Sequence, residues 1–145
     1  MIRNEKQYKI TKAHLNEFEA ALAERKVMPA PKDVDEGMWQ LEQDALKSQI
    51  EELRGELEAF DRLKTGQVHA AELTSLGDLA TLLIQARIAQ GLTQKQLAER
   101  LNVKEQQVQK DEANLYETAS LARLKRLAEV LGVEFEGQAR LPVGQ

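Results

Sequence analysis

The sequence predicts an all-α fold, in which a long-helix hairpin or coiled coil precedes a compact domain of short helices. Three observations support this. Apolar residues recur at helical spacing in nearly every segment, a seven-residue repeat runs through residues 39–60, and two short helical patterns joined by a tight turn follow it. We divide the 145 residues into an N-terminal helical region (1–66), a linker (67–73), a helical domain (74–133) and a C-terminal tail (134–145).

The first helix is expected to begin at Thr11, which can act as an N-cap, and to end near Lys26. Its inward stripe is Leu15, Phe18 and Leu22. Two prolines within residues 28–31 remove backbone donors and disfavour helix before them, so this stretch should connect to the next helix.

The second helix should run from Asp35 to Lys64, about 45 Å at 1.5 Å per residue. Apolar side chains recur along it at alternating spacings of three and four residues, amid mostly charged and polar neighbours. This seam is Trp39, Leu46, Ile50, Leu53, Leu57 and Phe60. It could close on the first helix as an antiparallel hairpin, on a second copy of the chain as a dimer, or on both. The sequence leaves these alternatives open.

Two short helices should follow the linker. Ser75 can cap a helix that ends at Gly91. Its expected inward residues are Leu76, Leu79, Leu82, Leu83 and Ala86. Thr93 and Gln96 form a capping box for the next helix, which Asn102 should end because asparagine tolerates the left-handed conformation.

A third short helix is expected over residues 105–113, with Val108 as its inward anchor. Its remaining residues are polar, and four of them share one exposed face: Glu105, Gln106, Gln109 and Lys110. In a DNA major groove, Gln pairs with adenine, Lys donates to guanine and Glu accepts from cytosine. The alternative is an ordinary solvated helix surface. A last helix should end at Gly132.

The net charge of −4 is unevenly distributed. Residues 1–74 carry 11 Lys and Arg against 15 Asp and Glu, whereas residues 75–131 carry 8 against 7. Most of the acidity therefore lies outside the proposed DNA reader. With so small a positive excess, affinity for double-stranded DNA should come from a few well-placed cations, and dimerisation would double the number of these cations.

Nothing in the sequence indicates catalysis, a cofactor or a metal. His14 and His69 are the only histidines and lack metal-ligand spacing, and there is no cysteine or Gly-rich phosphate loop. The absence of cysteine agrees with a reducing compartment, so we expect a cytoplasmic protein. We expect neither a signal peptide nor a membrane helix, because no apolar run approaches about 20 residues.

The run from Leu92 to Val103, followed by residues 106–110 and Glu112, resembles the Xre/Cro repressor-type helix-turn-helix. The whole chain also resembles a group of bacterial Xre proteins that begin with the motif spanning Asn4 to Lys12. The resemblance implies five short helices, the third of which lies in the major groove. It places the base-reading positions on the polar face described above.

The resemblance also implies that Gln94 touches phosphate or base, and we expect Lys95 and Lys104 to contact phosphate beside it. Arg87 and Glu112 match a salt-bridged pair joining the first and third helices. Lys104 stands where Ser or Thr usually caps the recognition helix, and Asn102 replaces a glycine. Asp111 replaces an aromatic or aliphatic residue, so it should cost packing or face solvent.

These observations predict a sequence-specific transcriptional regulator that acts as a homodimeric repressor. One alternative is the antitoxin of a toxin–antitoxin pair, which represses its own operon while its N-terminal helices or tail hold a toxin. Another is a coactivator-like bridging protein that has no specific affinity for DNA.

Overall fold

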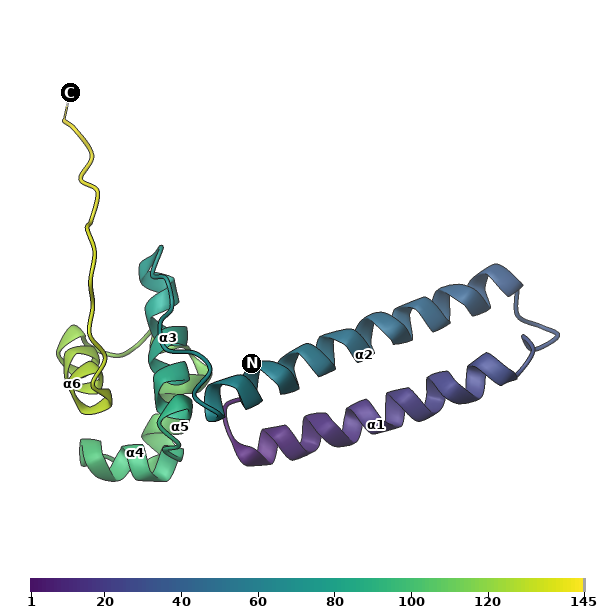
Figure 1. Cartoon of the computed structure of the whole chain (residues 1–145), viewed down its shortest axis with the longest axis horizontal. Coiled ribbons are helices and arrows are strands. Elements are labelled where there is room, and N and C mark those ends of the chain that lie inside the picture. Colours follow the sequence, from purple (N-terminus) through teal and green to yellow (C-terminus); the bar gives the residue numbers. More distant parts are fainter. Residues whose placement is uncertain (145) are drawn as a thin grey trace. The chain divides into compact units, whose positions relative to one another are not determined.

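A computed structural model describes residues 1–144, which contain six α-helices and no strand (Figure 1). The all-α prediction is therefore confirmed for this part of the chain. The helices fall into two compact units, residues 1–71 and the residues from 72 onward. Position 145 of the expected tail lies outside the described residues. No helix within residues 1–144 combines the length and apolar character needed to cross a membrane.

The first unit is an antiparallel hairpin of α1 (Glu5–Val27) and α2 (Glu36–Lys64), joined by the proline-containing connector (Figure 1). Contacts between the helices pair the start of one with the end of the other. They join Glu5 to Lys64, Tyr8 to Phe60 at 5.4 Å between ring centroids, Glu19 to Arg54 at 2.5 Å, and Arg25 to Glu42 at 3.3 Å.

The apolar seam of α2 packs against α1 within the same chain. Ile50, Leu57 and Phe60 are buried, and the other three seam residues, Trp39, Leu46 and Leu53, are half-buried. The side chain of Arg25 lies over the Trp39 ring, 5.3 Å from its centroid. The structure shows the antiparallel hairpin, in which α1, with 23 residues, spans most of the length of α2.

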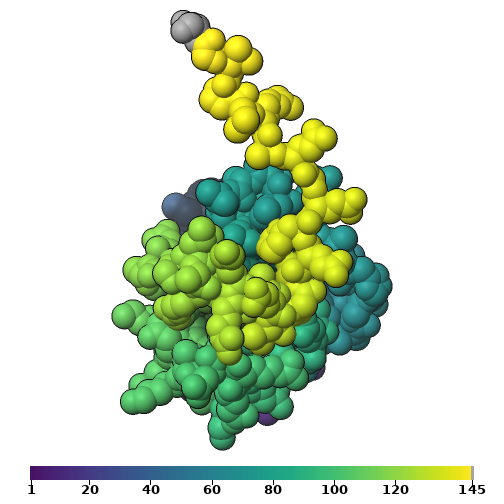
Figure 2. All heavy atoms as spheres, turned by 90° about the vertical axis from the view of Figure 1, so that its left-hand side faces the viewer, coloured from purple at the N-terminus to yellow at the C-terminus, as the bar shows by residue number. Residues whose placement is uncertain are grey.

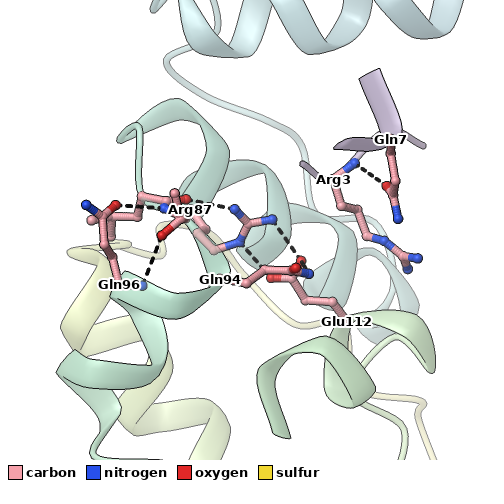
Figure 3. Close-up of polar contacts among 8 residues, drawn as sticks. Arg3, Gln7, Arg87, Gln94, Gln96 and Glu112 are labelled. Carbon is pink, nitrogen blue, oxygen red and sulfur yellow. Dashed lines mark hydrogen bonds and ion pairs between the residues drawn. The ribbon is translucent and has the colours of Figure 1, made fainter. Parts of the chain in front are cut away.

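The expected start of the first helix at Thr11 is wrong. Asn4 is the N-cap, and its Oδ1 accepts a hydrogen bond of 2.8 Å from the amide of Gln7. The side chain of Gln7 in turn accepts from the amide of Arg3 at 2.8 Å (Figure 3). Because residues 5–10 contain no proline or glycine, the helix extends back to this earlier cap.

The second unit contains α3 (Leu76–Ala89), α4 (Gln94–Leu101), α5 (Glu105–Ala113) and α6 (Leu121–Leu131). Its apolar core is Ala80, Leu83, Ile84, Ile88, Leu97, Ala98, Val108, Tyr116, Leu127 and Leu131. The resemblance implied five helices, whereas this unit has four in the described residues, since residues 114–118 form turns between α5 and α6.

The inward face of α3 differs from the expected one. Leu76 is 86% exposed, and Ile84 and Ile88 are buried in place of the expected Leu79 and Leu82, which are half-buried. The sequence of α3 is apolar around most of its circumference, so more than one stripe fits the helical period. At its start, hydrogen bonds from Thr74 and the amide of Ser75 hold the pKa of the Asp78 carboxyl below its ordinary value.

Candidate nucleic-acid interface

Local capping sets both ends of α4. The amide of Gln96 donates to Thr93 Oγ1 at 3.1 Å, and the amide of Thr93 donates to Gln96 Oε1 at 2.9 Å (Figure 3). Asn102 ends α4 in the left-handed conformation with φ of 55°. The chain therefore reverses within three residues and enters α5 at Glu105, as the sequence predicted.

The four polar residues on the expected reading face, Glu105, Gln106, Gln109 and Lys110, are all exposed in the structure. Val108 lies on the opposite side of α5 and is buried in the core. Gln109 Nε2 donates to Glu105 Oε1 at 3.3 Å, one turn away along the helix. The exposed face of α5 thus presents amide, ammonium and carboxylate groups together, while the opposite side of the helix packs into the core.

A buried ion pair fixes α5 to α3. The guanidinium of Arg87 donates through Nε to Glu112 Oε2 at 2.7 Å and through Nη2 to Oε1 at 2.8 Å (Figure 3). Its Nη1 also donates to the backbone oxygen of Leu92, at 2.7 Å, in the turn before α4. Both side chains are almost fully buried, with residue exposures of 2% for Arg87 and 0% for Glu112. One guanidinium therefore links three segments of the domain.

Gln94, the expected DNA contact at the start of α4, is turned inward. Its residue is buried, and its Nε2 donates to Glu112 Oε1 at 3.1 Å (Figure 3). The Glu112 carboxylate accounts for this inward position, because it offers a charged acceptor inside the domain. Lys95 and Lys104, by contrast, are exposed.

Asp111 is buried and paired, which corrects the expectation that it costs packing or faces solvent. Its carboxylate accepts from Gln107 Nε2 at 2.9 Å and forms an ion pair with Arg123 of α6. Arg123 is thus engaged within the protein. The spacing of Gln107 and Asp111 by four residues was the sequence signal for part of this contact.

The turn after α5 carries backbone strain. Leu115 and Tyr116 are consecutive non-glycine residues with φ of 54° and 56°. Tyr116 is buried, and the pKa of its hydroxyl is raised by that burial and by the nearby carboxylates of Glu112 and Asp111. Its amide donates to the backbone oxygen of Asp111 at 2.7 Å. Burial of the Tyr116 ring thus holds the left-handed turn in place.

We expect Leu115→Gly to be more stable than Leu115→Ala by about 1 kcal/mol, because glycine adopts this φ without the penalty that a Cβ carries. Leu115 is 46% exposed, and both variants lose the same partly buried side chain beyond Cβ. Urea denaturation of the two variants measures the difference. Inside an α-helix the order would be reversed, so a more stable alanine variant would contradict the left-handed assignment.

The charges of α4, α5 and the turn between them favour contact with an anion. Four cations are exposed there, namely Lys95, Arg100, Lys104 and Lys110. Of the four acidic residues in the same stretch, Asp111 and Glu112 are buried and paired with arginines, which leaves only Glu99 and Glu105 exposed. The exposed surface is therefore more positive than the sequence count suggests. Within residues 1–144, no cluster of His, Cys, Asp or Glu is arranged to hold a metal ion.

Residues 83–138 match the family model described as helix-turn-helix. The matched stretch includes α4, α5, α6 and the buried residues Arg87 and Glu112. It supports a DNA-binding regulator. A helix-turn-helix is a DNA-binding regulatory domain rather than an enzymatic one. Comparisons with curated proteins and with solved structures gave no match.

Proposed function

We propose that the chain is a sequence-specific transcriptional repressor that binds its operator as a homodimer. The observation that carries the proposal is the exposed polar face of α5, which the buried Val108 and Glu112 hold toward solvent. In this proposal α5 enters the major groove, and Glu105, Gln106, Gln109 and Lys110 read base edges.

Phosphate contacts in the proposal come from the exposed Lys95 and Lys104 at the starts of α4 and α5. Gln94 would contribute its backbone amide at the first turn of α4, where helix N-termini favour anions, while its side chain is hydrogen-bonded to Glu112. The cations give affinity for DNA of any sequence, whereas the polar face of α5 gives sequence specificity.

Genomic DNA captured by the purified chain and then sequenced tests this function. We expect enrichment of a two-fold symmetric motif, because each copy of a homodimer presents the same reading helix. Capture of DNA without any shared motif would leave only general attraction and would contradict the repressor. It would instead favour the coactivator-like bridging protein.

The antitoxin is a second candidate, favoured by a feature of the hairpin. Apolar side chains at its connector end are exposed, namely Val27, Met28, Met38 and Leu41. Exposed methionines are common on surfaces that bind other proteins. In this alternative the hairpin holds a toxin while the helix-turn-helix represses the operon. A captured motif that lies upstream of the chain's own gene and a neighbouring toxin-like gene supports it.

A further inference from the structure

The residues that follow α6 form an extended segment that is joined to the helix by a cap hydrogen bond, from the amide of Val133 to the backbone oxygen of Ala128 at 2.9 Å. Residues 133–143 belong to no helix and no strand ladder within the described part of the chain, and they lead away from α6 as a single strand (Figures 1 and 2). Three of their apolar side chains are highly exposed: Phe135 at 55%, Leu141 at 81% and Val143 at 93%. A segment of this kind leaves backbone donors and acceptors available for pairing.

The segment has a two-residue period over its whole length. The odd positions are apolar or small: Val133, Phe135, Gly137, Ala139, Leu141 and Val143. The even positions are polar or proline: Glu134, Glu136, Gln138, Arg140 and Pro142. In an extended chain, alternate side chains point to opposite faces, so this order is typical of a β-strand with one apolar face. Elsewhere the chain has the helical period.

We propose that residues 133–143 pair with the same residues of a second copy as an antiparallel two-stranded ribbon. The ribbon would be the dimerisation element of the homodimer described under the proposed function, and the inference rests on that homodimer. A two-fold axis through the middle of the ribbon places odd-numbered residues of one strand opposite odd-numbered residues of the other, and even-numbered residues opposite even-numbered ones. The apolar faces of both strands then lie on the same side.

The charges of the segment complement one another only in this orientation. The two carboxylates, Glu134 and Glu136, precede the one guanidinium, Arg140. If the two-fold axis passes through residue 137, Glu134 lies opposite the partner's Arg140. If it passes through residue 138, Glu136 lies opposite the partner's Arg140. In a parallel, in-register pair each charge would face its own copy, which is destabilising. Charge order therefore favours antiparallel pairing of two identical segments.

The backbone also fits one arrangement. Pro142 has no amide hydrogen, so the even residues, whose backbone groups point the same way, would face away from the partner strand. The odd residues from Phe135 onward would then exchange the hydrogen bonds across the ribbon, since the amide of Val133 already donates to the backbone oxygen of Ala128. Gly137 has φ of 145° in the single chain, and regular pairing requires it to turn to a negative φ. Glycine makes this change at little cost. A residue with a side chain would resist the single-chain conformation only, because the negative φ of a strand is open to all residues.

A lone two-stranded ribbon is marginally stable in water and needs cover on its apolar face. The helical unit that bears the segment offers apolar surface for this, because Leu76 at the start of α3 and Leu121 at the start of α6 are both exposed. We therefore expect a concentration-dependent dimer rather than a permanent one.

Reversal of one charge tests the ribbon. Sedimentation equilibrium of the full chain over a range of concentrations should show a dimer, and Arg140→Glu should weaken it about tenfold, since two attractive pairs become repulsive. Exchanging the signs in full, with Glu134→Arg, Glu136→Arg and Arg140→Glu together, should restore the dimer. Arg126→Glu, an exposed residue of α6, is the matched control and should leave the mass unchanged.

The outcomes separate this inference from the rest of the proposed function. A wild-type chain that stays monomeric at all concentrations overturns both the ribbon and the homodimer, while the captured DNA motif still reports on sequence recognition. A dimer that withstands Arg140→Glu, or one that full exchange fails to restore, overturns the ribbon and leaves the homodimer in place. Circular dichroism checks that the helices of every variant remain folded.

Discussion

Glu112→Ala should lower the free energy of unfolding of the helix-turn-helix unit by about 3 to 5 kcal/mol. The change removes the two carboxylate acceptors of the Arg87 guanidinium, at 2.7 and 2.8 Å, and so deprives that buried cation of the Glu112 counter-charge. It also removes the acceptor of the Gln94 side chain. Urea denaturation followed by circular dichroism measures the loss.

Two controls isolate the buried pair. Arg87→Met combined with Glu112→Leu removes both charges, so this variant should recover much of the stability that Glu112→Ala loses. Glu19→Ala breaks the exposed ion pair with Arg54 in the hairpin and should change stability by less than about 1 kcal/mol. A double-mutant cycle between Arg87→Ala and Glu112→Ala should show strong coupling. Coupling near zero would contradict the role given to the pair.

Gln106→Ala, Gln109→Ala and Lys110→Ala should each change the DNA sequence that the protein prefers. A lost contact to a base edge costs about 1 to 3 kcal/mol, or about five- to 150-fold in affinity, at one base pair. A two-fold dimer repeats the loss at both half-sites, whose centres should lie about 34 Å apart or a multiple of that distance. Selection of preferred sites from random DNA, followed by sequencing, measures each motif.

Lys95→Ala is the matched control for these variants, because this exposed cation is proposed to contact phosphate. It should weaken binding to all sequences alike and reduce the salt dependence of log affinity by about 1, with the motif unchanged. Identical motifs from the wild type and from all three α5 variants would overturn the assignment of α5 as the reading helix, even if every affinity had fallen.

Most helix boundaries are predictable from the sequence alone. The second helix starts after Asp35 and ends at Lys64, and α5 spans Glu105–Ala113, as the sequence predicted. The caps at Thr93 and Asn102 were also predictable from sequence. These features depend on hydrogen bonds and φ preferences among residues a few positions apart, and such interactions are readable without a tertiary fold.

The surfaces that meet are visible only in the folded units. It shows that the α2 seam is covered by α1, that Gln94 turns inward, and that Asp111 is buried against Arg123. It also shows that Leu76 of the apolar α3 stays exposed. Helical period gives the spacing of side chains around an axis, but burial depends on the neighbour that each face contacts. A charged residue such as Asp111 is stable inside only because a cation from a distant helix reaches it.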